Sequence, residues 1–436
     1  MQLDASNSAP SLSRRLRLAA CLLLASSGGR AAHAAAASAD PGTQLETSTL
    51  FYSEKGRTTV IEPVVRLTRL LSNGQSFSAR LVLDAMTGAS PTGATPSQTT
   101  QTTTSASGGS STTKAFQVPT SSFEDFRGAV DAEWQVPIGV VTPVTGAHVS
   151  REQDYRSLGV SEKVSIDMMQ RLTTLTVGGG YNADEVSPIG GTPIGLSDGT
   201  VRLEGSNSKN VAFGLVGLSR VITRRWLVGV TASRSEERGY LTEPYKVVSL
   251  LDSLGTPVGQ VTEHRPSSRA RSNVEAGSTY HLDQDILYSS YRYYWDDWGI
   301  QSHTIDLKYR HDLNASTWVQ PHLRGYAQTA AEFFTAGLPQ GSALPAFASG
   351  DYRLGALRSG TLGATLGFHI PKSPGEYTLR FEYIHQWGKG DRSSGEVGDG
   401  GEPGDDHRAG VSETVTHPAI APLDIGTVLI GYTVGF

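Results

Sequence analysis

Segments of about ten residues, in which apolar and polar side chains strictly alternate, recur along this chain. In the segment 76–85, Leu81 and Leu83 fall on one face of an extended strand, whereas Arg80 and Asp84 fall on the other. A period of two residues is typical of a β-strand whose two faces meet different environments. The pattern therefore predicts an all-β fold.

The polar faces of these segments carry charged residues, and no other part of the sequence offers a core for the apolar faces. In a transmembrane barrel, apolar side chains face lipid and polar side chains face the lumen, which accounts for both observations. Membrane helices would need about 20 consecutive apolar residues, and the sequence has no such run. Only 18% of the residues are charged, below the roughly 25% of a soluble domain. We therefore expect a transmembrane antiparallel β-barrel.

The N-terminus has the features of a cleaved secretory signal, which we assign to residues 1–34. Three arginines precede a short apolar stretch, 18–25, and an Ala-x-Ala cleavage site follows at 32–34. A lipoprotein signal ending at Cys21 is the alternative, but no apolar segment separates that cysteine from the arginines. We expect export to the outer membrane of a Gram-negative bacterium, with 35–43 as a short N-terminal segment in the periplasm.

Cysteine content and charge exclude several kinds of site and partner. Cys21 is the single cysteine, so the chain without its signal has neither a disulfide nor a thiolate metal site. The formal net charge is −5, which gives no basic footprint for nucleic acid. We expect no cofactor and no nucleic-acid partner.

Counting the alternating segments within 44–436 gives about fourteen strands, and sixteen is the alternative count. Short turns in such barrels face the periplasm and long loops face the outside. Short turns are expected at 72–75, 168–171, 223–226, 282–285, 314–317 and 371–376. Long extracellular loops are expected near 87–148, 185–209, 235–269, 335–350 and 389–420.

One segment, 127–137, alternates but is excluded from this count. A single additional strand there would place every later short turn outside and every later long loop inside, against the rule for bacterial barrels. We therefore assign it to the first long loop, 87–148, which could fold over the lumen as a plug or cap.

The final segment, 425–436, ends on a bare aromatic residue. Phe436, Val434 and Tyr432 share one face of this strand. We interpret the three residues as the signal that the barrel assembly machinery recognises, and expect the strand to seal the barrel against the first strand, near 45–53.

The charged residues on the polar faces predict the lining of the lumen. The candidates are Arg66, Arg80, Asp84, Asp306, Lys308, Arg310, Arg324, Arg380 and Glu382. A lining of one sign would indicate an ion-selective pore, whereas these residues carry both signs and can pair across the interior. A barrel of this size leaves room for water if nothing fills it.

Several stretches resemble a known bacterial family. They are TLFYSEKGRTTVIEPVVRLTRL, SARLVLDAMTGASP, HVSREQDYRSLGVS, GYLTEPYKVVS, EHRPSSRARSN, YRYYWDDWGIQSHTIDLKYR and GDYRLGAL. Together they cover nearly all of the chain beyond the signal and are similar to the family catalogued as domain of unknown function 3570. The resemblance implies an outer-membrane barrel but no reaction or substrate. Members are often encoded beside a flavin-transferring lipoprotein, which implies a redox setting without a role.

No motif predicts a catalytic, cofactor or metal residue. The aromatic and acidic stretch 295–298 could form a carbohydrate subsite, but an interfacial aromatic girdle is the more common use of such residues. The acidic run 391–406 lacks the spacing of a calcium loop. The stretches 243–246 and 263–266 flank one outer loop, and we expect charged contacts between them to clamp it rather than to bind a ligand.

Three classes of function follow from these observations. The first is a channel or transporter for small polar solutes. The second is a non-conducting scaffold or sheath for a periplasmic or surface partner, for example in a redox system. The third, and least favoured, is a hydrolase embedded in the barrel. We expect a protein that is not an enzyme, with outer-membrane lipid and the assembly machinery as its general partners.

Overall fold

The computed structural model describes residues 41–98, 100–104, 110–115, 117–388 and 422–436. The expected signal peptide and the acidic run 391–406 lie outside these residues. In the described part of the chain, no helix is long and apolar enough to cross a membrane.

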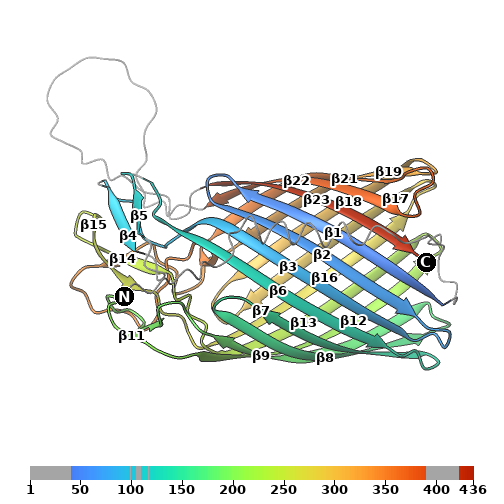
Figure 1. Cartoon of the computed structure of the whole chain (residues 1–436), viewed down its shortest axis with the longest axis horizontal. Helices are drawn as coiled ribbons and strands as arrows, with labels where there is room; N and C mark the ends of the chain where they lie inside the picture. The colour runs from blue at the N-terminus through green and yellow to red at the C-terminus, as the bar shows by residue number, and fades with distance from the viewer. Residues whose placement is uncertain (1–40, 99, 105–109, 116, 389–421) are drawn as a thin grey trace, which may run out of the picture.

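Sixteen antiparallel strands form one closed barrel, in which each strand pairs with its neighbour along the chain (Figure 1). The strands are β1 (Gly42–Glu54), β2 (Thr58–Leu70), β3 (Ser76–Pro91), β6 (Thr120–Gln135), β7 (Val141–Arg151), β8 (Tyr155–Met168), β9 (Thr173–Val186), β12 (Asn207–Thr223), β13 (Trp226–Gly239), β16 (Ser268–His281), β17 (Asp285–Asp296), β18 (Gln301–Asn314), β19 (Thr317–Gln328), β21 (Leu357–His369), β22 (Glu376–Gly388) and β23 (Leu423–Gly435).

The last strand closes the ring against the first, as the sequence predicts. Gln44 of β1 lies opposite Gly435 of β23, and the pairing continues to Glu54 and Ile425. Beyond it, the N–H of Phe436 donates to the carbonyl of Thr43 at 2.8 Å. Closure gives every strand two hydrogen-bonded neighbours, which is what a barrel in lipid requires.

The count of about fourteen strands is wrong and the alternative count of sixteen is confirmed, because the expected loop 87–148 contains β6 and most of β7. β6 covers the excluded segment 127–137 in part, and β7 returns after the short connection 136–140. Two added strands leave the direction of every later strand unchanged, so the argument that excluded one strand did not exclude a pair. The sequence pattern did not predict β7, because Pro143 and Gly146 interrupt its alternation. The first long connection is therefore shorter than expected and spans 92–119.

The barrel has two different ends. At the turn end, which carries the C-terminus in Figure 1, all seven hairpin connections are short, six of them at the expected positions. At the opposite loop end, three connections are short (55–57, 152–154 and 297–300), which the sequence did not predict. The other described connections at the loop end are 92–119, 187–206, 240–267 and 329–356. They contain β4 (Gln101–Thr104), β5 (Ser110–Thr113), β10 (Thr192–Pro193), β11 (Arg202–Leu203), β14 (Val247–Leu251), β15 (Pro257–Thr262), β20 (Leu338–Pro339) and the short helix η1 (Tyr352–Leu354).

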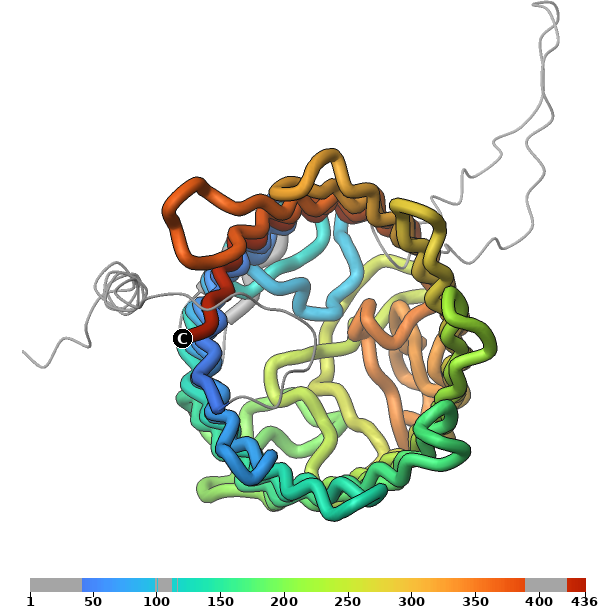
Figure 2. The backbone as a smooth tube through the Cα atoms, turned by 90° about the vertical axis from the view of Figure 1, so that its right-hand side faces the viewer, coloured from blue at the N-terminus to red at the C-terminus, as the bar shows by residue number. Residues whose placement is uncertain are grey.

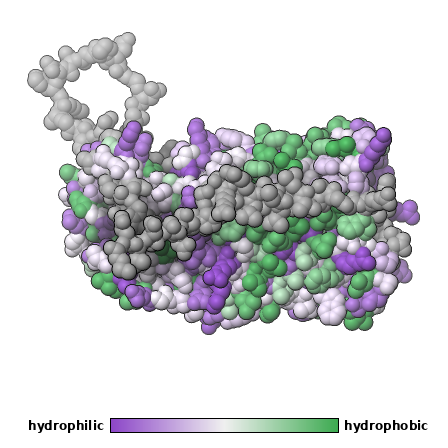
Figure 3. Space-filling model, in the orientation of Figure 1, coloured by the Kyte–Doolittle hydropathy of each residue, from purple (hydrophilic) through white to green (hydrophobic). Residues whose placement is uncertain are grey.

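The outer surface of the wall is apolar. In one row across β18, β19 and β21, Leu307 lies opposite Leu323, and Leu323 lies opposite Leu362. Leu323 is 55% exposed and Leu362 is 63% exposed. Figure 3 shows hydrophobic residues along the outside of the strands, with hydrophilic residues toward both ends of the barrel. An exposed apolar wall of this kind is the lipid-facing surface of a membrane barrel.

Replacing Leu323 with Arg tests this lipid-facing assignment. A cation at mid-depth on the lipid face should destabilise the folded barrel by about 2–4 kcal/mol. The measurement is urea-induced unfolding in phospholipid vesicles. The matched control is Gln320→Arg, because Gln320 lies on the other face of β19 and lines an inner recess. Equal stability of the two variants would contradict the assignment.

Replacing Phe436 with Ser tests the terminal assembly signal, which stays a prediction. The backbone hydrogen bonds to Thr43 remain available in this variant, so a loss of assembled barrel reports on the aromatic side chain alone. We expect less heat-modifiable barrel in outer-membrane fractions, and normal amounts for the control Phe436→Tyr. Wild-type levels of Phe436→Ser would show that the ring is dispensable.

Candidate functional site

Four segments at the loop end pack on one another, and we call them the loop assembly: 91–98, 188–203, 240–265 and 330–355. Figure 2 looks along the barrel from the turn end, and shows light-blue, yellow-green and orange segments inside the ring of strands. The N–H of Val247 donates to the carbonyl of Thr92 at 2.8 Å, and the N–H of His264 donates to the carbonyl of Ala348 at 2.9 Å. Residues far apart in the sequence therefore form one compact unit at the mouth.

The loop assembly has a small hydrophobic core of its own. Val248 and Ala348 are almost fully buried, and Val261 packs with them. β14 pairs with β15 and with β20, which adds backbone hydrogen bonds to this packing. Such a core and sheet give these connections a fixed shape, unlike typical surface loops.

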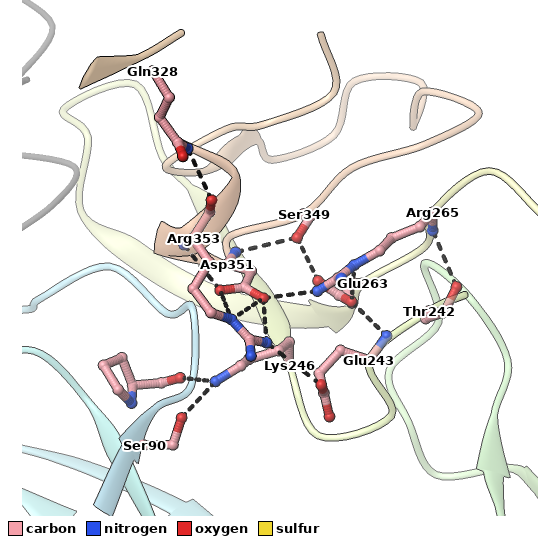
Figure 4. A network of polar contacts seen from close by, with 11 residues as sticks. Ser90, Thr242, Glu243, Lys246, Glu263, Arg265, Gln328, Ser349, Asp351 and Arg353 are labelled. Carbon is pink, nitrogen blue, oxygen red and sulfur yellow. Dashed lines mark hydrogen bonds and ion pairs between the residues drawn. The ribbon is translucent and has the colours of Figure 1, made fainter. Parts of the chain in front are cut away.

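The centre of the loop assembly is a buried charged network, which we call the hub (Figure 4). Asp351 accepts hydrogen bonds from Arg265 at 2.9 Å and from Arg353 at 2.6 Å. Glu263 lies 2.6 Å from Nε of Arg265, and accepts from the hydroxyl of Ser349. The side chains of Glu263 and Asp351 are 0% and 1% exposed. The cost of burying these charges is offset because each has partners of opposite sign.

The hub connects the loop assembly to the barrel wall. The ammonium of Lys246 donates to the hydroxyl of Ser90, at the end of β3, at 2.8 Å. On another side, the side-chain amide of Gln328, at the end of β19, donates to the carbonyl of Arg353 at 3.0 Å. The hub thereby ties the loop assembly to two separate strands.

The charge states in the hub follow from burial and from neighbouring charges. Burial alone raises the pKa of Asp351, but the hydrogen bond and charge of Arg353, with those of Arg265 and Lys246, hold the pKa below its ordinary value. Burial lowers the pKa of the Lys246 ammonium, although Asp351 opposes this shift. Asp351 is therefore a buried anion whose charge balances that of the surrounding cations.

The sequence predicted part of this network. The expected clamp between 243–246 and 263–266 is confirmed, since the N–H of Glu243 donates to Glu263 at 2.7 Å. Asp351 and Arg353 were missed, because nothing in the sequence indicates that a segment about 90 residues further on meets Glu263. A charged Asp-x-Arg pair beside a glycine was the available signal.

All nine expected lumen residues lie on the strand face opposite the exposed apolar rows. Arg66, for example, precedes the exposed Leu67, and Glu382 lies between the exposed Phe381 and Tyr383. Recesses on this inner face include Arg66, Arg80, Asp306 and Lys308 in their linings. Whether these residues line an open path stays a prediction.

Three of the nine residues belong to a first group on β2, β3, β6 and β7. Nη1 of Arg80 lies 3.5 Å from Asp131, and the same carboxylate lies 2.6 Å from Nδ1 of His148. Asp84 pairs with Arg127. Arg66 lies opposite Arg80 in the ladder. The sequence missed Arg127 and Asp131 because their strand was assigned to a loop.

The other six residues belong to a second group on β18, β19 and β22. His322 lies 2.9 Å from Asp306 and 2.9 Å from Glu382. Asp306 also lies 3.4 Å from Lys308. Arg310 pairs with Asp312 at 3.1 Å on the same strand. Arg324 and Arg380 lie on the strands that carry this cluster. The sequence missed His322 because one histidine on an alternating strand shows no ligand spacing.

The other candidate sites do not form. Asp296 accepts from Arg269 at 2.5 Å and from the N–H of Trp298 at 3.1 Å, whereas Asp297 accepts from the N–H of Ala270 at 2.9 Å. The two carboxylates therefore serve separate structural contacts rather than a common subsite. Among the described residues, no group of three or more His, Cys, Asp and Glu is placed to hold a metal ion. Each described histidine with a side-chain hydrogen bond contacts a carboxylate, a tyrosine or a backbone carbonyl.

Replacing Asp351 with Asn tests the hub. The change leaves Arg265 and Arg353 without their shared anion, and breaking a buried ion pair costs about 3–5 kcal/mol. We expect faster tryptic cleavage after Arg353 and after Lys246, measured by mass spectrometry on the folded protein in detergent. The barrel itself should keep its heat-modifiable mobility.

The matched control is Asp283→Asn, which removes an exposed pair with Arg225 that should contribute only about 0–1 kcal/mol.

Because the folded-state pKa of Asp351 is lowered, its contribution is present above the ordinary value of about 3.9 and is lost as the pH falls through the folded-state pKa. Wild-type protection should therefore persist under mildly acidic conditions. Unchanged cleavage of Asp351→Asn would refute the hub.

Comparisons with known proteins identify a family but no activity. The model of a family described as "Protein of unknown function (DUF3570)" matches residues 13–401. No curated protein matches the chain.

Three solved structures are among those to which this chain shows a distant similarity. A mutant of the ferric enterobactin receptor PfeA of Pseudomonas aeruginosa is 12% identical, with a TM-score of 0.42 over 81% of this chain and 54% of that chain. OccK3 (OpdO) of the same organism is 9% identical, with a TM-score of 0.39 over 91% and 96%. The siderophore receptor PirA of Acinetobacter baumannii is 10% identical, with a TM-score of 0.39 over 80% and 53%. The chain thus spans about half the length of the two receptors.

The family model covers most of the chain, and the closed barrel with its apolar outer wall agrees with the family resemblance seen in the sequence. The chain therefore belongs to the DUF3570 family of proteins of unknown function, and its fold is a closed antiparallel β-barrel with an apolar outer wall.

Proposed function

We propose that this protein is an outer-membrane channel through which small polar solutes diffuse. The observation that carries the proposal is a closed barrel of sixteen strands whose inner face bears charged residues of both signs. Porins with sixteen to eighteen strands leave an aqueous channel, and a polar lumen is the usual lining. Recesses of about 320–480 Å³ on the inner face support the same interpretation.

The orientation of the channel is part of the proposal. Short turns face the periplasm in bacterial barrels, so the turn end would lie inside and the loop end outside. A signal peptide at 1–34, outer-membrane lipid and the barrel assembly machinery complete this picture of export and insertion. The loop assembly then lies at the outer mouth, where it narrows the entrance and selects solutes by size.

The second candidate is a non-conducting scaffold or sheath for a periplasmic or surface partner. Its support is the loop assembly, because segments with their own core lie at the loop end, within the outline of the ring when viewed along the barrel (Figures 1 and 2). A redox partner would fit the genomic setting that the family resemblance implies. A hydrolase is not favoured, because the described histidines make no hydrogen bond to a serine hydroxyl that could serve as a nucleophile.

Single-channel recording of the refolded protein in a planar bilayer tests the channel. We expect steady conductance from the wild-type chain, and larger, less steady conductance from Asp351→Asn, because that variant loosens the loop assembly. Without its signal the chain has no cysteine, so a cysteine introduced at Ser290, which lines an inner recess, reports on the lumen. A membrane-impermeant methanethiosulfonate should reduce the conductance of Ser290→Cys.

The control for this experiment is Leu307→Cys, which places the thiol on the lipid face. Modification of this variant should leave the conductance unchanged, which rules out a contaminating pore or a nonspecific effect. Silence of both the wild-type chain and Asp351→Asn would overturn the channel and favour the scaffold.

A further inference from the structure

His322 bridges two carboxylates on the inner face of the barrel. The residue lies on β19 and is 8% exposed. Its Nε2 lies 2.9 Å from Oδ2 of Asp306 on β18, and its Nδ1 lies 2.9 Å from Oε1 of Glu382 on β22. Both ring nitrogens are therefore in hydrogen-bonding contact with acidic side chains.

The two contacts occupy both ring nitrogens of His322. An ionised carboxylate only accepts hydrogen bonds. Each ring nitrogen lies 2.9 Å from a carboxylate oxygen. The ammonium of Lys308 lies 3.4 Å from Asp306 and is a further partner of that carboxylate. The bridge therefore engages both carboxylates.

Gly363 makes this bridge possible. On β21, Gly363 lies between His322 and Glu382 in the ladder. A Cβ added to Gly363 would lie 2.6 Å from Cγ of Glu382 and 2.8 Å from the carbonyl of Phe381. The Glu382 side chain thus crosses over the strand at a position where a side chain would block it.

The bridge occupies the carboxylates that could neutralise two neighbouring arginines. Arg324 lies directly opposite Asp306 in the ladder and is exposed. Arg380 lies two residues before Glu382, and its Nε donates to the hydroxyl of Thr365 at 3.3 Å. Among the described residues, no carboxylate oxygen lies within ion-pair distance of either guanidinium.

Arg292 lies further toward the loop end. It lies on the inner face of β17, opposite Thr304, and lines a recess of about 480 Å³ together with Tyr294 and Tyr326. Glu275 of β16 lies directly opposite Arg292 in the ladder and therefore on the same inner face, so Arg292 has an acidic neighbour. The guanidinium groups without an anion are therefore those of Arg324 on β19 and Arg380 on β22.

We propose that Arg324 and Arg380 form a binding strip for small solutes that carry an oxyanion, such as a carboxylate or a phosphate. The planar guanidinium matches both oxyanions with paired hydrogen bonds. Unpaired charges of one sign on the wall of a lumen raise the local concentration of the opposite ion. His322 serves as a positioning residue, because it holds Asp306 and Glu382 away from the arginines. This inference rests on the proposed channel and names its solute class.

The test is the reversal potential of the refolded full-length mature protein in a planar bilayer under a gradient of KCl. The wild-type channel should prefer chloride over potassium. The double variant Arg324→Gln and Arg380→Gln should lose this preference while it still conducts. Inorganic phosphate and acetate are then added in turn to the wild-type channel. The oxyanion that reduces the chloride current at the lower concentration is the preferred one.

A second variant separates the positioning role of His322 from simple removal of arginines. In His322→Gln, one carboxylate loses its donor and becomes available to an arginine, so the chloride preference should fall although no arginine is changed. The matched control is His311→Gln, whose ring lies on the other face of β18 and contacts Asp285. That control should retain wild-type selectivity.

The outcomes separate the two proposals. Absence of wild-type conductance would overturn the channel itself. Conductance with unchanged selectivity in the double arginine variant would overturn the binding strip and leave the channel standing. Heat-modifiable mobility confirms that each variant is folded, and the exposed Arg324→Gln alone provides a folded test if the buried His322→Gln fails to assemble.

Discussion

The pairing of β1 with β23 is the interaction on which the rest of the structure depends. In a bilayer, backbone N–H and C=O groups have no water to bond, so an open sheet edge is not stable there. The eleven paired positions from Gln44 to Glu54 remove that edge. Once the ring is closed, alternation along every strand assigns apolar side chains to lipid and charged ones to the interior.

Closure also explains why the interior is organised by charge pairs. Side chains on the inner face cannot pack into a common hydrophobic core, because the far wall is too distant in a barrel of sixteen strands. They are instead held by neighbours on adjacent strands, as in the contacts of Arg80 with Asp131 and of His322 with Asp306. Such short-range pairing leaves some charges without partners, and those charges are available to a solute.

The loop assembly is stabilised differently from the barrel wall, because its segments must keep a fixed shape outside the sheet. It uses a few apolar residues around Val248 and a buried network around Asp351. A buried ion network is costly unless every charge is paired, so it permits few alternative arrangements. Anchoring at Ser90 and Gln328 places this unit at the mouth of the barrel. Different interactions therefore stabilise the loop assembly at the entrance and the strands of the barrel wall.

The sequence alone determined the fold class, the sealing of the last strand against the first, and the inner or outer face of each charged residue, because a two-residue period is a local property that lipid makes strict. It did not determine that Thr120–Gln135 and Val141–Arg151 are two strands. The first was excluded because one added strand would reverse all later ones, and Pro143 and Gly146 weaken the alternation of the second. Nor did it reveal the hub or the His322 bridge. Those contacts join residues brought together only by ring closure and loop packing, and no local pattern encodes such distant pairs. The tertiary structure therefore decided which charges are paired, which remain unpaired, and what lies at the mouth.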